Sequence, residues 1–165
     1  MMPLMQDADL LAALMGSLAK APRVYSLCRR DPEADLASHV LEVAKAAEKQ
    51  WAHDAVKGAV GPSFIDDIAT ALSPVTSDTA LELMVNLSAS DLVYPNHDHR
   101  DRTHAARAAQ RVASLLGPRA EWVSNIEGPW LNGRAWDPVT MFTFDGVIAG
   151  RGAGFVVVLL QVGED

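Results

Sequence analysis

The chain has 165 residues, a formal net charge of −7, and 49% hydrophobic against 21% charged residues. This balance is typical of a folded protein and excludes the charge-rich, apolar-poor class of disordered chains. The acidic charge disfavours nucleic acid and anionic membranes as partners, because both are bound by concentrated positive charge. The length favours one domain, residues 1–165, which can bury about two-thirds of the surface of its unfolded chain.

The composition changes at Gly117-Pro118. Alanine and apolar residues at helical spacing dominate the part before this junction, whereas tryptophan, phenylalanine, valine and glycine are enriched after it. Alanine favours helices, and aromatic and β-branched residues favour strands. The sequence therefore predicts an α+β fold in which a helical N-terminal two-thirds, residues 1–117, packs on a small antiparallel C-terminal sheet, residues 118–165.

Two long helices are expected first. Apolar residues recur at helical spacing in residues 7–20, and Pro22 ends that segment. Residues 24–28 suit either a short strand or a helical turn. The run Asp31-Pro32-Glu33 then supplies an N-cap, a proline for the first turn and an early acid. It opens a second helix, whose apolar stripe continues to Ala55.

Three further helices are expected before the junction. Residues 63–72 carry a capping-box pattern that predicts a short helix. Residues 76–87 favour another helix, although their apolar run also suits a strand. After a polar loop, residues 105–116 favour a helix that Asp101 or Thr103 caps and that glycine followed by proline ends.

Three strands are expected after the junction. Residues 121–126 and 139–149 alternate between apolar and polar positions, and residues 155–162 are apolar on both faces. A strand that is apolar on both faces has to be covered on both, so the last strand is predicted to be central. The glycines of residues 150–154 lead into that strand rather than into a helix. They therefore predict a hairpin turn and no phosphate-containing cofactor.

The single cysteine, Cys28, favours a cytoplasmic protein, since a lone thiol is stable in the reducing cytosol. The N-terminal residues include Asp7 and Asp9 before the first base, Lys20, whereas a secretory signal begins with positive charge. The longest apolar run, residues 155–160, is too short to span a bilayer. These features predict a cytoplasmic protein with no membrane partner.

Three of the five histidines, His97, His99 and His104, lie close together next to aspartates at a predicted helix start. Imidazole and carboxylate ligands suit zinc. Their spacing matches no zinc signature, however, and Arg100 and Arg102 between them raise the energy of a nearby cation. We therefore expect a solvated loop without a metal, with a metal-assisted enzyme as an alternative.

The most distinctive segment is residues 128–138, in which prolines bound an Asn-Gly turn. Tryptophan and arginine in this segment are the residue types that dominate interaction hot spots. The predicted binding residues are therefore Trp130, Asn132, Arg134 and Trp136. The alternative is that both indoles fold back as a lid over the sheet.

No pattern in the chain indicates catalysis or a cofactor. A small acidic protein with a rigid aromatic loop suits a protein-interaction or neutralising, immunity-like module whose partner has a basic surface, because opposite charge accelerates encounter. Two alternatives remain open, namely the metal-assisted enzyme built on the histidines and a small-molecule binding protein. The sequence makes no prediction of oligomeric state.

Overall fold

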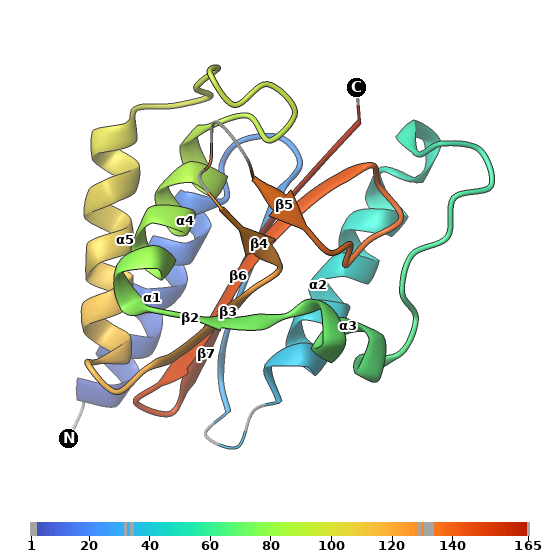
Figure 1. The fold of residues 1–165 in the computed structure, drawn as a ribbon. Helices are drawn as coiled ribbons and strands as arrows, with labels where there is room; N and C mark the ends of the chain where they lie inside the picture. The colour runs from blue at the N-terminus through green and yellow to red at the C-terminus, as the bar shows by residue number, and fades with distance from the viewer. Residues whose placement is uncertain (1–2, 32, 34, 129, 131–133, 165) are drawn as a thin grey trace.

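One antiparallel sheet lies between two layers of helices (Figure 1). The computed structural model describes residues 3–31, 33, 35–128, 130 and 134–164. The elements of these residues, in chain order, are α1 (Pro3–Leu18), β1 (Val24–Arg30), α2 (Leu36–Gln50), the 3-10 turn η1 (Ala52–Asp54), α3 (Ile65–Ala71), β2 (Ser73–Val75), α4 (Ser77–Ala89), α5 (Arg102–Leu116), β3 (Glu121–Ser124), β4 (Ile126–Glu127), β5 (Ala135–Trp136), β6 (Phe144–Gly152) and β7 (Phe155–Gly163). The main sheet has the order β1-β7-β6-β3-β2, and β4 pairs with β5 as a separate hairpin.

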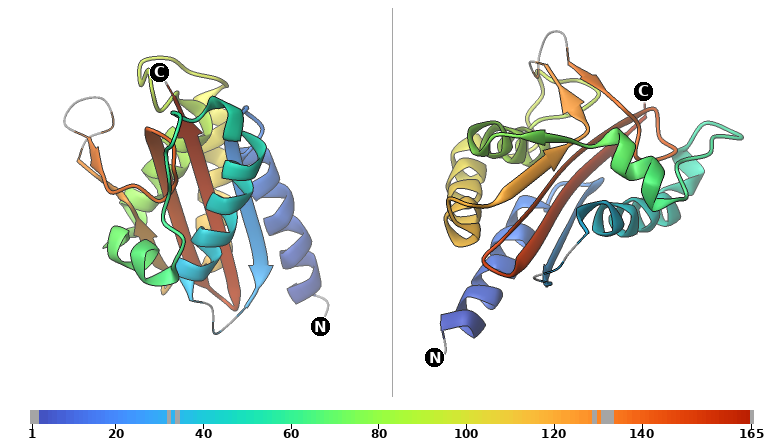
Figure 2. Two further views of the ribbon diagram at one scale, coloured as in Figure 1. Left: turned by 90° about the vertical axis from the view of Figure 1, so that its right-hand side faces the viewer. Right: turned by 60° about the horizontal axis from the view of Figure 1, so that its bottom comes forward.

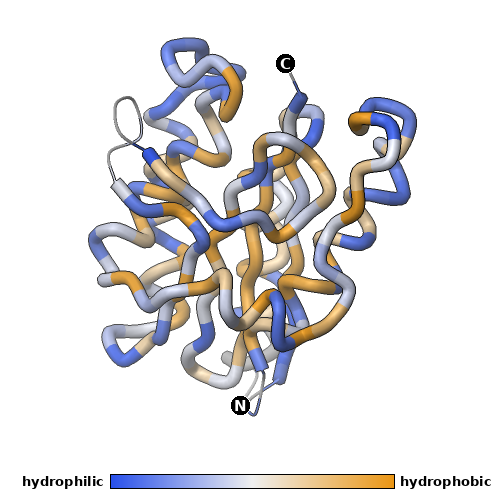
Figure 3. The backbone as a smooth tube through the Cα atoms, turned by 45° about the vertical axis from the view of Figure 1, so that its right-hand side comes forward, coloured by the Kyte–Doolittle hydropathy of each residue, from blue (hydrophilic) through white to orange (hydrophobic). Residues whose placement is uncertain are grey.

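The two layers of helices bury opposite faces of β7. Helices α1, α4 and α5 lie on one face of the sheet, and α2 and α3 lie on the other (Figures 1 and 2). Val157 and Leu159 belong to the core under the first layer, whereas Val156, Val158 and Leu160 belong to the core under the second. The prediction that the last strand is central and covered on both faces is confirmed, and Figure 3 shows hydrophobic colour concentrated on the central strands.

The predicted α+β class is confirmed, but two strands of the main sheet come from the helical part of the chain. Strand β1 pairs with β7 along its whole length. Of the two structures considered for residues 24–28, a short strand or a helical turn, the strand is therefore correct. Strand β2, which the sequence did not predict, pairs with β3 through Ser73, Pro74 and Val75. Three residues with a proline carry little strand signal, and the proline is tolerated because β2 is an edge strand.

Helix α2 is shorter than predicted at both ends. Its N-cap is Asp35 rather than Asp31, because the Asp35 side chain accepts a hydrogen bond from Ala37 N at 3.1 Å and so satisfies a free N–H of the first turn. The helix ends at Gln50. The 3-10 turn η1 follows it, so the apolar stripe does not continue as one helix to Ala55.

Helices α4 and α5 agree with the sequence prediction. Thr76 caps α4 by accepting a hydrogen bond from Thr79 N at 3.1 Å, which decides the helix over the strand for this segment. Asp101 caps α5 by accepting from Thr103 N at 2.9 Å, and Gly117 ends it with φ 89°. None of the described helices is long and apolar enough to cross a membrane.

The strand predicted over residues 139–149 is wrong at its start. Residues 139–143 form a loop, and β6 begins at Phe144. The cause is the buried carboxylate of Asp145, which accepts hydrogen bonds from the backbone N–H and the hydroxyl of Thr140 at 2.9 and 2.7 Å. The loop therefore wraps around this carboxylate instead of extending the strand.

The glycine-rich turn is also shorter than expected. It consists of Ala153 and Gly154, with φ 53° and 83°, and β6 extends to Gly152. Gly150 lies inside β6, where a Cβ atom would come within 2.3 Å of the Trp122 ring. The hairpin turn is confirmed, and the earlier glycines allow close packing on the sheet.

Burial raises the pKa of Asp145 to about 6, although hydrogen bonds from Thr140, Val139 and Asn125 act in the opposite direction. Between about pH 4 and 6 this carboxyl is therefore protonated in the native protein but ionised in the unfolded chain. As pH rises through this range, the free energy of unfolding falls, by about 3 kcal/mol in total. We expect Asp145→Asn to remove this pH dependence in urea denaturation, and NMR titration of the wild-type carboxyl to show the raised pKa.

Asp137→Asn is the control, because Asp137 is exposed and its substitution should keep the wild-type slope. An Asp145 carboxyl that titrates near pH 4 would contradict the prediction.

Candidate functional site

The predicted binding loop belongs to the β4–β5 hairpin, which leaves the main sheet at the end of β3 (Figure 1). The two short strands meet at the pair Ile126 and Trp136. Asn125 closes the base of the hairpin, because its side-chain nitrogen donates to Asp137 O at 2.9 Å and its backbone oxygen accepts from Asp137 N at 3.2 Å. Asn132 lies outside the described residues.

The other three predicted binding residues form one stack. The Arg134 guanidinium carbon lies 4.7 Å from the centroid of the Trp130 ring and 5.5 Å from that of Trp136. Both indoles are partly buried and pack against the core under α1, α4 and α5. A cation against an aromatic face is stabilising by about 0.5–2 kcal/mol, depending on its exposure. The structure thus brings together three residues that the sequence singled out one by one.

Backbone hydrogen bonds hold the Arg134 side chain in this stack. Its Nη2 donates to Leu92 O at 2.6 Å, and its Nη1 donates to Trp130 O at 3.4 Å. Burial lowers the pKa of Arg134, because removal from water disfavours the charged guanidinium. Leu92 N in turn donates to Gln161 Oε1 of β7 at 2.7 Å, so the hairpin is connected to the central strand.

The hairpin therefore covers part of the core and leaves part of each indole exposed. The Trp136 ring stacks on Phe144, with centroids 5.5 Å apart and an interplanar angle of 30°. Because each indole is partly exposed, the stack can offer aromatic edges to a partner without reorganisation. Its described members are two indoles and a guanidinium, which can make apolar, cation–π and hydrogen-bonding contacts.

We expect Trp136→Ala to lower the free energy of unfolding by about 2 kcal/mol, as measured by urea denaturation. The loss is smaller than the ~3–5 kcal/mol of a fully buried aromatic, because part of the indole is already in water. Tyr94→Ala is the control, since Tyr94 is 64% exposed and should change stability by less than about 0.5 kcal/mol. A Trp136→Ala protein as stable as the wild type would show that the indole does not pack on the core.

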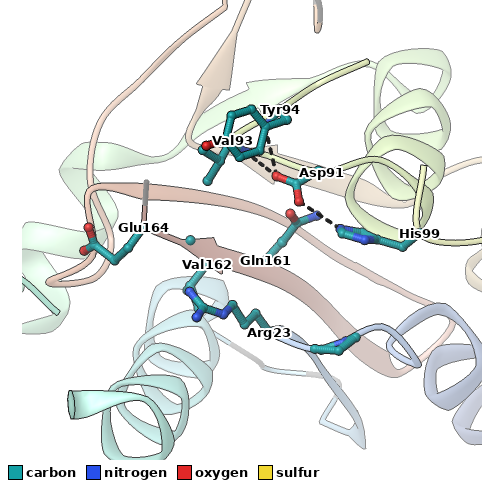
Figure 4. Close-up of a pocket in the computed structure, with 10 residues that line it drawn as sticks. Arg23, Asp91, Val93, Tyr94, His99, Gln161, Val162 and Glu164 are labelled. Atoms are coloured by element: carbon teal, nitrogen blue, oxygen red, sulfur yellow. Dashed lines mark hydrogen bonds and ion pairs between the residues drawn. The ribbon is translucent and has the colours of Figure 1, made fainter. Parts of the chain in front are cut away.

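A cavity of about 210 Å³ lies where β1 begins and β7 ends (Figure 4). Asp91 lines it from the segment after α4. Its Oδ1 accepts hydrogen bonds from Val93 N and Tyr94 N at 2.7 and 2.9 Å, and its Oδ2 lies 3.5 Å from His99 Nε2. Asp91 therefore orders the loop that lines the cavity.

The other charged groups at this cavity also have partners. Arg23 bonds to Asp54 Oδ2 at 2.7 Å, and Glu164 accepts from the backbone N–H and the hydroxyl of Thr143. Paired groups of this kind support the local fold.

The histidines considered as metal ligands for the alternative function, His97, His99 and His104, do not line one common cavity. His99 and His104 line a second cavity of about 480 Å³, together with Lys20 and Asp101, whereas His97 is not among its lining residues. Within the described residues no three His, Cys, Asp or Glu side chains form a group that could hold a metal ion. The described residues therefore supply no set of metal ligands for the metal-assisted enzyme.

The arginines between those histidines connect α5 to its neighbours. Arg100 donates to the backbone oxygen of Ser17 at the end of α1. Arg102 donates to Asn86 Oδ1 and Ser90 Oγ at 2.7 and 2.5 Å. Both guanidiniums are therefore used within the fold.

An exposed apolar segment was not anticipated from the sequence. Four of the five large hydrophobic side chains that are exposed among the described residues lie in the segment after α2 and at the first residue of α3, with exposed fractions from 42% to 86%; they are Val56, Val60, Phe64 and Ile65. Each of these side chains exposes apolar surface to solvent. The signal was present in the sequence, as apolar residues next to the Gly61-Pro62 helix stop.

No family model, no curated protein and no solved structure matches this chain. Its function has to be inferred from the chemistry of its own surface. That surface combines a preorganised aromatic hairpin, an exposed apolar segment and cavities lined by charged groups.

Proposed function

We propose that this protein is a non-enzymatic interaction module that binds, and thereby neutralises, a protein with a basic surface. The observation that carries the proposal is a set of unpaired acids around the exposed edge of β2. We call this set the acidic edge; it consists of Asp66, Asp67, Asp78, Glu82 and Glu127. Because a lone cysteine favours a reducing compartment, we place this module in the cytoplasm.

The acidic edge is assembled from three elements around β2. Asp66 and Asp67 lie in the first turn of α3, Asp78 and Glu82 lie near the start of α4, and Glu127 lies on β4. Helix α3 and the start of α4 lie at opposite ends of β2, and the β4–β5 hairpin lies beside it (Figures 1 and 2). All five side chains are exposed.

The negative charge of this edge is not balanced locally. The sequence has no Lys or Arg between positions 58 and 99. Several bases elsewhere are paired within the fold, as in the Arg29–Glu42 and Arg23–Asp54 ion pairs. None of the five acids forms an ion pair with another described residue. The edge therefore attracts a positively charged surface and accelerates its encounter.

Apolar side chains next to the acids supply an anchor. Phe64 precedes α3 and is 72% exposed, and Ile65 is 42% exposed. Charge alone mainly affects association rates, whereas burial of an aromatic side chain supplies binding free energy. In the β4–β5 hairpin beside β2, the partly exposed indoles of Trp130 and Trp136 extend the surface. A protein with arginines or lysines around an apolar pocket fits both features.

The acidic edge can be tested with a labelled oligoarginine peptide as a probe, by fluorescence anisotropy at low salt. We expect Asp66→Asn/Asp67→Asn/Asp78→Asn to weaken binding about tenfold, since each exposed charge contributes up to about 0.5 kcal/mol and 1.4 kcal/mol corresponds to a factor of ten. The effect should fall as salt rises, because ions screen exposed charges.

The matched control is Asp7→Asn/Asp9→Asn/Glu33→Gln, which removes the same charge from α1 and from the segment after β1. It should change the affinity much less than the edge variant. Equal losses in the two variants would mean that the peptide responds to net charge alone, and the acidic edge would have no special role.

A further inference from the structure

The cavity of about 480 Å³ lies between the end of α1 and the start of α5, and three segments contribute basic side chains to it. Lys20 comes from the turn after α1, His99 and Arg100 come from the loop between α4 and α5, and His104 comes from the first turn of α5. Among the described residues that line it, Asp101 is the one acid. We call this site the basic cavity; it contrasts with the net charge of −7 of the whole chain.

The carboxylate of Asp101 only partly balances these positive charges. Its Oδ1 accepts the capping hydrogen bond from Thr103 N at 2.9 Å. Lys20 and His104 are exposed, and within the described chain neither of them forms an ion pair. Because like charges around one cavity repel one another, an anion that enters it stabilises the folded protein.

Arg100 is anchored through one nitrogen of its guanidinium. Its Nη1 donates to Ser17 O and, at 3.4 Å, to Ser88 Oγ. The other two nitrogens, Nη2 and Nε, form no hydrogen bond with a described residue and are not among the buried polar atoms that lack a partner. They are therefore accessible to solvent. Nη2 and Nε form a planar fork that matches two oxygens of one oxyanion, and the anchored side chain loses little freedom on binding.

The donors of the basic cavity favour a phosphate group over a carboxylate. Arg100 offers its fork, Lys20 a compact ammonium group and His104 a ring nitrogen, and the three come from separate segments. A carboxylate has two oxygens in one plane. A phosphate monoester has three terminal oxygens that point in different directions, and its charge is about −1.5 to −2 at pH 7. Donors on several sides of a cavity are therefore matched best by phosphate.

The basic cavity is larger than a phosphate group. Its volume lies within the range of about 300–1,000 Å³ that is typical of small-molecule sites. Ala21 and Pro22 also line it, so part of its wall is apolar. An organic substituent on the phosphate therefore has both space and apolar cover beside the basic side chains.

We propose that the basic cavity binds a small organic phosphate monoester. Arg100 and Lys20 neutralise the phosphate, His104 donates to a third oxygen, and the substituent packs against Pro22. His99 lies at the boundary with the neighbouring cavity, where its Nε2 is 3.5 Å from Asp91 Oδ2, so that Asp91 orients the ring (Figure 4). This inference does not depend on the proposed function, because the acidic edge shares no residue with the basic cavity.

Isothermal titration calorimetry with phenyl phosphate, a simple organic monoester, tests the proposal at low salt. We expect one molecule to bind per chain, at least tenfold more tightly than phthalate, which has a similar charge but only carboxylate oxygens. Inorganic phosphate should bind at least threefold more weakly because it lacks the substituent, and uncharged phenol should not bind. No saturable binding of phenyl phosphate, or equal affinity for phthalate or for inorganic phosphate, would overturn the proposal.

The site is tested by Lys20→Gln/His104→Gln, which removes two donors at exposed positions and should therefore leave the circular dichroism spectrum unchanged. We expect its affinity for phenyl phosphate to fall at least tenfold. The matched control, Lys57→Gln/His53→Gln, removes the same residue types from exposed positions after α2 and should change the affinity less than twofold. Equal losses in the two variants, or full affinity of the Lys20→Gln/His104→Gln protein, would place the ligand elsewhere and contradict the proposal.

The histidines provide a second test that needs no variant. During an NMR titration with phenyl phosphate at constant pH, the ring signals of His99 and His104 should shift with one common midpoint. Those of His39 in α2 and His53 in η1 should not shift, because both residues lie outside the basic cavity. Equal shifts at all four histidines, or no shift at His99 and His104, would rule out binding at this site.

Discussion

Strand β7 is buried on both faces along the whole of Phe155–Gly163. Burial on both faces requires cover on both sides of the sheet, and each Å² of apolar surface removed from water contributes about 25 cal/mol. Apolar side chains of α1, α4 and α5 cover one face, and those of α2 and α3 cover the other. Both faces of the sheet are therefore part of the core, and β1 and β2 form its two edges.

A polar residue within this strand connects the core to the candidate site. The amide of Gln161 accepts from Leu92 N and donates to Leu87 O and Ser90 O, all within 2.9 Å. A buried polar group without such partners would cost about 1–3 kcal/mol, so these bonds hold the end of α4 against β7. Leu92 O then accepts from Arg134, the residue between the two indoles. Hydrogen bonds that begin at β7, inside the sheet, thus fix the position of the β4–β5 hairpin.

The two edges differ in ways that suit different partners. The β2 edge is short and contains Pro74, which removes a backbone donor, so side chains rather than backbone groups dominate its chemistry. The acids around it are exposed, and Phe64 before α3 is exposed as well. The β1 edge is longer and offers backbone donors and acceptors, which suits pairing with a strand.

In the loop before β6, contacts between distant residues override the local sequence pattern. The sequence predicts a strand from residue 139, yet the Val139 and Thr140 N–H groups donate to the carboxylate of Asp145, and residues 139–143 form a loop. The side chain of Asn125, from the other side of β3, donates to the same carboxylate at 2.8 Å. No local pattern can report such a bond, because its partners are brought together by the fold.

The sequence by itself determined the α+β class, the approximate positions of the five helices and the central position of the last strand. Each of these follows from a local property, namely hydrophobic period, capping residues or an apolar run on both faces. It also singled out Trp130, Arg134 and Trp136 by residue type.

Only the tertiary structure decided that β1 and β2 join the sheet, that Arg134 lies between the indoles, and that Phe64 remains exposed. Strand pairing, stacking and exposure depend on residues far apart in the chain. Local periodicity indicates which face of a segment is apolar, but the packing of distant segments decides what covers that face.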